Sequence, residues 1–298
     1  MNQQKEDYTD FKAELGPSKQ HKSKIQSGLY VVATPIGNLR DITLRALDVL
    51  EAADLVLCED TRITKRLLQA YSLNKPLLAY HDHNADKMRP KIMEALEAGK
   101  VVAQASDAGT PLVSDPGYKL VRDCIEEGHK VYPIPGASAP LTALAAAGLP
   151  SDRFLFIGFL PTKKKAKTEF LAQESKSGAT LICFESPKRL TSTLSDIAEI
   201  WPDRQIVVAR ELTKMFEEFK RGTAKDVSDH YTENGNPKGE IVILLEPAKQ
   251  AESSEADVDN MLKEALKSNS VRDAAAIVAE ATNLPKKQIY KRALDLNG

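Results

Sequence analysis

The 298-residue sequence contains no G-x-G anywhere, and no G-x-x-x-x-G-K follows an expected strand. The first absence excludes the usual dinucleotide-binding fingerprint, and the second excludes a phosphate-binding P-loop. No G-x-S-x-G is present either, which excludes the nucleophile elbow of α/β-hydrolases. If the chain binds a small molecule, it does so through loops of another kind.

Cysteine, net charge and long apolar runs are also scarce. Cys58, Cys124 and Cys183 lie far apart with no Cys-x-x-Cys pair, which favours a reducing cytoplasm. Lys plus Arg total 41 and Asp plus Glu total 42, so the formal charge of −1 leaves nucleic-acid binding to local patches. Because the apolar runs are far shorter than a membrane span and the first residues are polar, we expect a soluble protein with no membrane partner.

Metal-ligand patterns are weak as well. His81 and His83 form the only close histidine pair, and no third ligand has an evident spacing from them. A structural or catalytic zinc site needs at least three protein ligands. The sequence therefore predicts no metal site.

Residues 28–149 alternate between short apolar segments and helical patterns, which predicts a parallel sheet flanked by helices. The expected strands are Leu29–Ala33, Asp54–Cys58, a segment within 76–84, residues 100–105 and a segment ending before Pro135. The expected helices start after Thr43, cover Thr64–Tyr71 and Asp86–Glu97, start at Tyr118, and start at Ser138 or Pro140. Residues 1–27 mix polar residues with isolated apolar ones, so we expect a disordered tail.

The loop within residues 105–121 is the most unusual stretch of this half. Gly109 and Gly117 reach backbone angles that other residues adopt only at a cost, and Pro111 and Pro116 forbid an early helix. A strand, a glycine-bearing loop and a helix in succession place backbone N–H groups at the carboxyl edge of a parallel sheet, where α/β proteins bind ligands. An ordinary connection rich in turn residues is the alternative interpretation.

Residues 150–247 predict a second α/β domain with mixed strand pairing. The expected elements are strands at Phe154–Phe159, Thr180–Phe184, Gln205–Arg210 and Glu240–Glu246 and a helix at Ser186–Ile200. A polar, acidic linker is expected at 248–258, followed by a helical module at 259–298 with segments Val258–Leu266, Val271–Ala281 and Lys286–Leu294. The basic last segment allows a helix-turn-helix-like nucleic-acid module, and a solvated amphipathic helix is the alternative.

A series of motifs along the chain resembles one known family. The motifs are ATPIGNLRDIT (33–43), CEDTR (58–62), YHDHN (80–84), SDAGTPLVSDPGY (106–118), PGASA (135–139), GLPSDRF (148–154), GFLP (158–161), FESPKRL (184–190) and ARELTK (209–214). Together they resemble the ribosomal RNA small-subunit methyltransferase I family, within the tetrapyrrole-methylase superfamily of S-adenosylmethionine enzymes. The resemblance covers roughly residues 28–247, and the number and order of motifs make it specific.

The resemblance implies a tetrapyrrole-methylase-like two-domain α/β fold, with a parallel-sheet N-terminal domain, a mixed-sheet second domain and a small C-terminal helical module. It implies a homodimer that uses S-adenosylmethionine to methylate the ribose 2′-hydroxyl of a cytidine in 16S ribosomal RNA, free or within the small ribosomal subunit. Many superfamily members carry G-x-G-x-G-D in the first loop, whereas this chain has TPIGNLRD. This departure weakens a first alternative, methylation of a tetrapyrrole carbon; a second alternative is an RNA-binding assembly factor without catalysis.

The resemblance also assigns cofactor-binding positions, in the strand-exit loops of the first domain and on the second domain. They are Pro35, Gly37, Asn38, Asp107, Ala108, Gly109, Thr110, Asp115, Gly136, Ala137, Ser138, Phe184, Leu212, Gly239 and Glu240.

A group that accepts the hydroxyl proton would assist the reaction. The candidate catalytic residues at strand ends are Glu59, Arg62, Glu185 and Glu211, with Asp60 as a further carboxylate. Each carboxylate has a structural alternative as a helix cap or ion-pair partner, and Arg62 is suited to holding a phosphate or a carboxylate. The sequence offers no basis for choosing one base.

Basic residues near the domain junction are candidates for RNA contacts, because phosphate binding needs a local positive surface. The candidates are Lys163, Lys164, Lys165, Lys167 and Arg189. A solvated face is the alternative interpretation of the lysine run.

Overall fold

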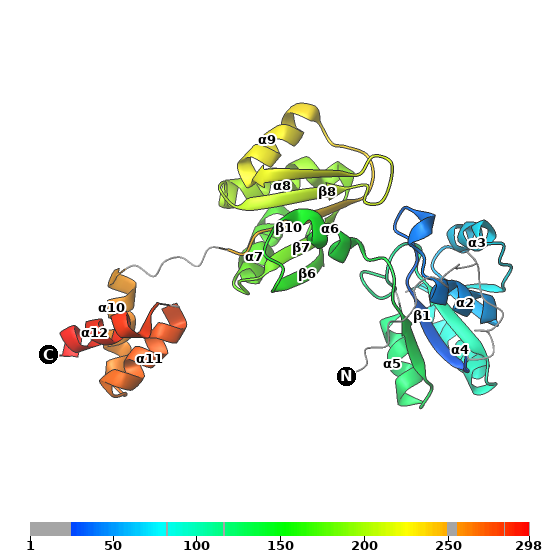
Figure 1. Ribbon diagram of the computed structural model, residues 1–298, viewed down its shortest axis with the longest axis horizontal. Helices are drawn as coiled ribbons and strands as arrows, with labels where there is room; N and C mark the ends of the chain where they lie inside the picture. The colour runs from blue at the N-terminus through cyan, green and yellow to red at the C-terminus, as the bar shows by residue number, and fades with distance from the viewer. Residues whose placement is uncertain (1–24, 82, 116, 249–254, 283, 298) are drawn as a thin grey trace, which may run out of the picture. The chain divides into compact units, whose positions relative to one another are not determined.

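The computed structural model describes residues 25–81, 83–115, 117–248, 255–282 and 284–297 (Figure 1). The chain divides into two compact units. One holds residues 1–174 and 179–246, and the other holds residues 247–298 together with the short segment 175–178. The expected N-terminal tail lies outside the described residues except for 25–27, and so does most of the expected linker.

The first sheet is parallel throughout, as the sequence predicts. Its strand order is β3-β2-β4-β1-β5. The strands are β1 (Gly28–Val32), β2 (Leu55–Cys58), β3 (Leu77–Ala79), β4 (Val101–Ala105) and β5 (Val131–Ile134). The helices between and after them are η2 (Leu39–Asp41), α2 (Leu44–Ala52), α3 (Thr61–Ala70), α4 (Ala85–Glu97), α5 (Tyr118–Glu126) and α6 (Ala139–Ala147).

Consecutive residues of these strands pack into two different hydrophobic clusters. Leu29 and Val102 belong to the cluster that contains residues of α4 and α5, whereas Tyr30 and Ala103 belong to the cluster of α2 and α3. Because side chains alternate across a strand, both faces of the sheet are buried beneath helices. The carboxyl ends of the strands therefore carry the loops that remain available for ligands.

The second sheet is mixed, with strand order β6-β7-β10-β8-β9. Strands β6 and β7 are parallel, while β10 runs antiparallel to β7 and β8, and β9 runs antiparallel to β8. The strands are β6 (Phe154–Phe159), β7 (Thr180–Glu185), β8 (Gln205–Arg210), β9 (Glu218–Thr223) and β10 (Ile241–Leu245). The helices are α7 (Lys164–Ser175), η3 (Pro187–Arg189), α8 (Leu190–Ile200) and α9 (Ala224–Asn234).

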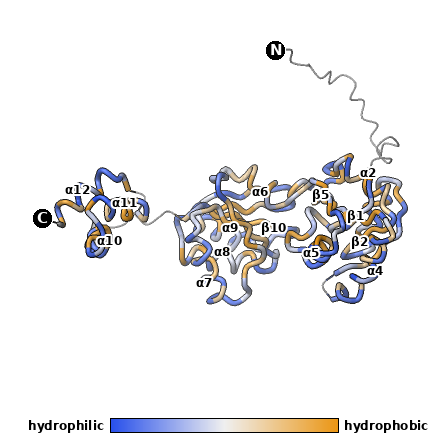
Figure 2. Tube along the Cα trace, turned by 90° about the horizontal axis from the view of Figure 1, so that it is seen from below, coloured by the Kyte–Doolittle hydropathy of each residue, from blue (hydrophilic) through white to orange (hydrophobic). Residues whose placement is uncertain are grey.

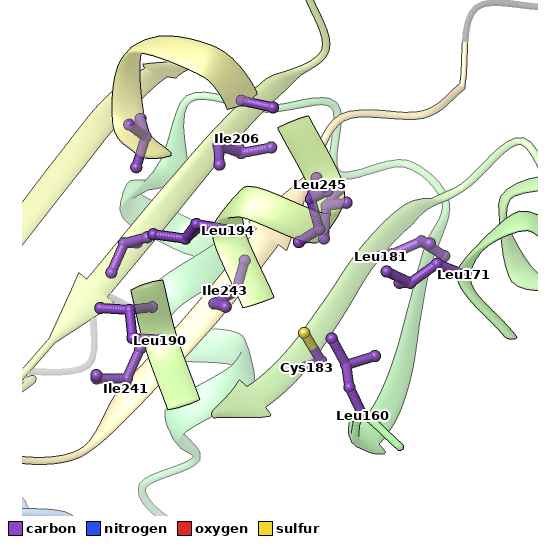
Figure 3. Close-up of a cluster of buried hydrophobic side chains, with 14 of the residues drawn as sticks. Leu160, Leu171, Leu181, Cys183, Leu190, Leu194, Ile206, Ile241, Ile243 and Leu245 are labelled. Atoms are coloured by element: carbon purple, nitrogen blue, oxygen red, sulfur yellow. The ribbon is translucent and has the colours of Figure 1, made fainter. Parts of the chain in front are cut away.

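One face of this sheet packs on residues of α7, α8 and α9. Figure 3 shows Leu190 beside Ile241, and Leu181 beside Leu171, all within one buried cluster. The tube in Figure 2 is orange along β10, the central strand of this sheet, all of whose residues are buried.

The opposite face of the second sheet is covered by a helix of the first half. Ala143, Leu144 and Ala147 of α6 pack with Ile182, Val207 and other residues of β7, β8 and β10. Ile36, from the loop after β1, belongs to the same cluster. This face of the second sheet therefore packs on α6 and the first loop, which both come from the first half of the chain.

The C-terminal unit consists of α10 (Glu255–Leu266), α11 (Val271–Thr282) and α12 (Lys286–Asn297) around a small core. Arg292 of α12 donates a hydrogen bond to the carboxylate of Asp259 on α10. Arg292, one of the basic residues of the last segment, thus has a structural role.

Several elements differ from the sequence prediction. Helix α3 begins at Thr61 rather than Thr64, because the Asp60 side chain accepts the Arg62 N–H at 2.8 Å and caps the helix earlier. Helix α10 begins at Glu255, inside the expected linker. The boundaries of the predicted domains stay a prediction.

Three elements of the second half were not predicted: β9, α7 and α9. Strand β9 is a polar edge strand of intermediate burial, so it lacks the alternation that identifies half-buried strands. Helix α9 is capped by Thr223, whose hydroxyl accepts the Asp226 N–H at 3.1 Å. That Thr-x-x-Asp sequence is a helix-start signal that the prediction overlooked.

Within the described ranges, no helix combines the length and the apolar character needed to cross a membrane.

Candidate active site

The loops that follow β1, β2, β4 and β5 are bonded to one another at the carboxyl edge of the first sheet. Thr34 and Gly109 exchange backbone hydrogen bonds of 2.9 and 3.0 Å. The Asp60 N–H donates to Asp107 Oδ1 at 3.1 Å, and the Thr110 hydroxyl donates to the Ala137 carbonyl at 3.1 Å. Four segments that are far apart in sequence therefore form one connected rim.

Two glycines let these loops approach closely. Gly109 has φ of +82°, a value that other residues adopt only with strain. A Cβ on Gly136 would lie 2.9 Å from the Ala33 Cβ, closer than real side chains come. These two constraints explain why the motifs quoted above contain glycine at positions 109 and 136.

Two carboxylates of the loop after β4 lie partly buried in the rim. Ser106 donates its hydroxyl hydrogen bond to Asp115 Oδ2. Burial raises the pKa of Asp107, and it also raises the pKa of Asp115. Both groups are therefore easier to protonate than ordinary aspartates, which is a common property of residues in functional clefts.

The second half contributes the strained loop after β8. Glu211 has φ of 50° and Thr213 has φ of 64°, both in the left-handed region that disfavours side chains with a Cβ. Lys214 Nζ lies 2.7 Å from Glu211 Oε1 and 2.9 Å from Glu240 Oε2. Because it pairs chiefly with Lys214, Glu211 has a lowered pKa.

This loop is also joined to the first half. The Asn38 N–H donates to Thr213 Oγ1 at 3.1 Å. Gly239 has φ of +100°, and a Cβ there would lie 2.3 Å from Glu211 side-chain atoms, so another residue would be strained and would displace that carboxylate. The Asn38 hydrogen bond and the close contact between Gly37 and the Lys214 side chain hold Lys214 near the first loop.

Between these segments lie two cavities of about 440 Å³ each, which we call the first and the second chamber. The first chamber is lined by Ile36, Asp107, Ala108, Ser114, Asp115, Ala139, Phe159, Phe184, Glu185, Ser186, Pro187, Leu212, Gly239, Glu240, Ile241 and Val242. The second is lined by Thr34, Pro35, Ile36, Gly37, Leu39, Ile63, Arg66, Leu67, Asp107, Ala108, Lys214 and Glu240. Ile36, Asp107, Ala108 and Glu240 line both and form the shared wall.

The predicted cofactor residues fall into three groups. The first chamber is lined by Asp107, Ala108, Asp115, Phe184, Leu212, Gly239 and Glu240. Pro35 and Gly37 line the second chamber. Neither cavity is lined by the remaining six, Asn38, Gly109, Thr110, Gly136, Ala137 and Ser138. Of this last group, Gly109, Thr110 and Ala137 take part in the bonds that connect the rim, and Asn38 is bonded to Thr213 of the loop after β8.

The predicted catalytic residues lie in very different surroundings. Glu185 has a side chain that is 0% exposed; it accepts hydrogen bonds from the Ser186 N–H and the Thr193 hydroxyl and pairs with Arg189 at 3.1 Å. Glu211 is paired with Lys214. Both carboxylates are therefore ion-pair partners, which is the structural alternative given in the sequence analysis. We do not propose either of them as the proton acceptor.

The other two predicted catalytic residues lie near the end of β2. Arg62 pairs with Asp60, and this hydrogen-bonded contact lowers the pKa of Asp60 to about 2. Glu59 lines a small recess together with Asp107, beside the first chamber. Neither residue lines one of the two large chambers.

Several lining residues were not predicted, notably Ile36, Phe159, Ile241 and Val242. Phe159 and Ile36 lie inside quoted motifs, so the motifs contained a signal for them. Ile241 and Val242 look like ordinary core residues of a strand. Only the pairing of β10 between β7 and β8 places them at the chamber.

The predicted RNA-binding lysines are not equivalent. Lys167 is 2% exposed, and its ammonium donates to Thr193 Oγ1 and Asp196 Oδ2, both at 2.9 Å. A lysine held in this way cannot reach a phosphate, so the prediction for Lys167 is wrong. Lys164 pairs with Glu199 while remaining exposed, and Lys163 and Lys165 are exposed as well.

Arg189 also has a structural role. It donates to the Leu160 carbonyl at 2.7 Å and pairs with Glu185. In the part of the chain that the structure describes, no group of three or more His, Cys, Asp or Glu residues is placed to hold a metal ion.

Comparisons with known proteins give consistent matches. The profile of tetrapyrrole (corrin/porphyrin) methylases matches residues 28–228, and the profile of the RsmI C-terminal HTH domain matches residues 252–297. A Mesorhizobium japonicum protein named ribosomal RNA small subunit methyltransferase I is 49% identical over 273 residues, which are 91% of this chain and 93% of that protein.

Solved structures show the same fold at lower identity. The cobalamin biosynthetic enzyme cobalt precorrin-4 methyltransferase, CbiF, has a TM-score of 0.56 at 24% identity, over 78% of this chain and 98% of its own. Uroporphyrin-III C-methyltransferase from Thermus thermophilus, complexed with S-adenosylhomocysteine, has a TM-score of 0.53 at 17% identity, over 73% of this chain and 96% of its own. These likenesses confirm the predicted fold class.

Proposed function

The chain belongs to the ribosomal RNA small subunit methyltransferase I family, and from this premise we propose the reaction that it catalyses. It is a methyltransferase of small-subunit ribosomal RNA. The proposal is that it moves a methyl group from S-adenosylmethionine to the ribose 2′-oxygen of a cytidine in 16S ribosomal RNA. The observation that carries the proposal is the lining of the first chamber.

The first chamber suits S-adenosylmethionine in size and chemistry. A volume of about 440 Å³ lies within the range of about 300–1,000 Å³ that is usual for small-molecule sites. Phe159, Phe184 and Leu212 offer apolar surface for an adenosyl group, and Asp107 and Asp115 offer negative charge to a cationic ligand. The glycine at position 239 leaves backbone accessible in the wall.

The protein's contribution to the transfer is to hold two reactants in line, with no covalent nucleophile of its own. When bound, S-adenosylmethionine supplies a methyl group on a positively charged sulfur. In the transfer, the ribose O–H bond breaks, an O–CH₃ bond forms and the S–CH₃ bond breaks, leaving a neutral thioether. The released proton needs an acceptor near the ribose oxygen.

We propose Asp107 as that acceptor. It lines both chambers, so its carboxylate lies at the wall where the two reactants must meet. The Asp60 N–H fixes Oδ1 and leaves Oδ2 to accept a proton. Burial raises the pKa of Asp107 toward the range in which a carboxylate accepts a proton more readily. Glu240 lines the same wall but is paired with Lys214, which makes it the poorer base.

We further propose that the chain acts as a homodimer in the cytoplasm. Large apolar side chains are exposed on the unit that holds the two sheets, including Leu141, Phe154 and Phe216, and such residues often mark interfaces. All three cysteines are buried free thiols, which suits a reducing compartment. Sedimentation equilibrium tests the oligomeric state, since a mass of one chain at all concentrations would contradict the dimer.

The test of the reaction is transfer of labelled methyl from S-adenosylmethionine to small ribosomal subunits that lack the modification. Nuclease digestion then locates the label. We expect an alkali-resistant dinucleotide that contains 2′-O-methylcytidine. Uptake of label by a porphyrinogen instead would establish the tetrapyrrole alternative, and binding of subunits without any transfer would establish an assembly factor.

A further inference from the structure

The second chamber has a lining unlike that of the first. Its apolar surface comes from Leu39, which is 48% exposed, and from Ile63, which is 43% exposed. Two cations, Arg66 and Lys214, line it as well. Large apolar side chains left half open beside positive charge suit a ligand with a flat apolar part and an anionic part.

The walls of this chamber are tied together before any ligand binds. The Tyr71 hydroxyl at the end of α3 donates to the Leu39 carbonyl, and the Asn38 N–H donates to Thr213 Oγ1. Ile63, Arg66 and Leu67 lie at i, i+3 and i+4 of α3, so they share one face of that helix. The chamber is thus a preformed site, which lowers the cost of binding.

The positive charges of the chamber differ in how they are used. Lys214 is balanced by Glu211 and Glu240. Arg66, by contrast, makes no ion pair with any residue that the structure describes. An arginine with an open guanidinium is well suited to a phosphate group.

The position of the chamber restricts its role. It shares Ile36, Asp107, Ala108 and Glu240 with the first chamber. A larger cavity of about 580 Å³ beside β3, lined by Lys65 and Lys75, shares no residue with the first chamber. The recess that holds Glu59 also reaches Asp107, but its volume of about 10 Å³ is too small for a nucleotide. A ligand in the second chamber can therefore present an atom to the proposed proton acceptor and to the methyl donor at once.

We infer that the second chamber binds the acceptor nucleotide of the RNA, with its base against Leu39 and Ile63 and an adjacent phosphate at Arg66. The inference rests on the proposed function and specifies where its RNA substrate binds. The ribose 2′-oxygen of this nucleotide lies toward Asp107 on the shared wall. The oxygen gains the methyl group across this wall, and its proton passes to the Asp107 carboxylate.

The first experiment uses a single accessible thiol. All three native cysteines are buried, so Ile63→Cys introduces a site for maleimide at the chamber. We expect unmodified small ribosomal subunits to slow alkylation at this site at least about tenfold, and S-adenosylmethionine alone to leave the rate unchanged. The matched control is Ile125→Cys, because Ile125 is 62% exposed on α5 and lines neither chamber.

Equal protection of both engineered cysteines would overturn the inference, and so would protection of Ile63→Cys by S-adenosylmethionine alone. Protection by a porphyrinogen rather than by subunits would also overturn it. If the protein without substitutions methylates RNA while the two engineered thiols are equally protected, the proposed function stands and this inference fails. If it methylates no RNA, the proposed function itself fails.

The second experiment narrows the chamber. Ile63→Trp adds bulk at an exposed position, so we expect kcat/KM for subunits to fall at least about tenfold while the S-adenosylmethionine Kd stays within about twofold. Arg66→Gln should reduce the salt dependence of subunit binding by about one phosphate contact, a change of about 0.7–0.9 in the log–log slope. Unchanged transfer by both variants, or equal losses of donor and RNA binding, would contradict the inference.

Discussion

The two sheets contribute to the same pair of chambers by different means. The parallel sheet contributes loops at the ends of its strands, and those loops bring the carboxylates Asp107 and Asp115. The mixed sheet contributes side chains of the strands themselves, such as Phe159 and Val242, and a strained loop at Glu211. One half therefore provides carboxylates on loops, while the other provides a wall of strand side chains, some of which, such as Val242, also belong to its core.

This difference predicts how each half responds to substitution. Side chains on the strand-end loops can change without disturbing the packing of the first sheet, so their variants should alter chemistry more than stability. Side chains behind the wall of the second half support the fold, so their variants should alter stability first. The following predictions test this contrast, from the largest expected effect to the smallest.

Asp107→Asn should reduce methyl transfer by about 10²–10⁴-fold, the usual contribution of a positioned proton acceptor. The acceptor must be ionised, and burial raises the pKa of Asp107. The log of the rate for the unmodified protein should thus rise with pH through this raised pKa and then level off. The variant should lack that rise. Calorimetry with S-adenosylmethionine is the control, because a lost rate with equally lost donor affinity would assign Asp107 to binding alone.

Lys167→Met should lower the free energy of unfolding by about 3 kcal/mol, because it leaves Asp196 without its buried partner. Urea unfolding monitored by circular dichroism measures the change. Lys165→Met, two residues earlier and 89% exposed at its side chain, is the matched control and should change stability by about 0.5 kcal/mol or less. Similar losses of unfolding free energy in both variants would show that the buried pair of Lys167 and Asp196 adds no stability of its own.

Phe159→Ala should weaken S-adenosylmethionine binding about tenfold, since it removes an aromatic wall of the first chamber. Phe159 is 58% exposed, so little stability should be lost. Phe154, at the other end of β6, lines neither chamber, and Phe154→Ala serves as the control in the same titration. Equal affinity in the two variants would place the donor elsewhere.

Lys165→Gln should have the smallest effect, a decrease of subunit affinity well below tenfold and a salt slope lower by about 0.7–0.9. The prediction retains Lys163, Lys164 and Lys165 as RNA contacts. Lys225→Gln on α9, where Lys225 is paired with Asp229, is a comparison on the same half of the molecule. An unchanged salt slope for Lys165→Gln would remove the lysine run from the RNA surface.

Much of the first half could be predicted from the sequence, because its strands are short apolar segments separated by loops that contain glycine and proline. The resemblance of the motif within 106–118 to one family assigned Asp107 and Asp115 as cofactor-binding positions. The shared role of Asp107 could not be predicted, since it depends on which other segments approach the loop. Only the fold brings Glu240, with its ion-pair partner Lys214, beside Asp107.

The second half was harder to predict, for physical reasons that particular residues show. Glu185 resembles a reactive strand-end carboxylate, yet Arg189 and Thr193 occupy its oxygens. Lys167 belongs to a run of lysines, yet it lies on the buried face of α7, four residues before the core residue Leu171. In both cases the deciding partner comes from a different turn or element, and local sequence does not reveal it.

Helix α6 has a consequence for how this protein can be divided. It follows the last strand of the parallel sheet, yet its alanines and Leu144 complete the core of the mixed sheet. A protein fragment that starts after Gly148 would therefore contain a sheet with one hydrophobic face exposed to solvent, and we expect it to aggregate. A fragment that ends there would carry a helix with nothing to pack on. We expect the two fragments to associate through α6 when they are expressed together. The turn at Gly148 is therefore a suitable site for dividing the enzyme into two complementing fragments.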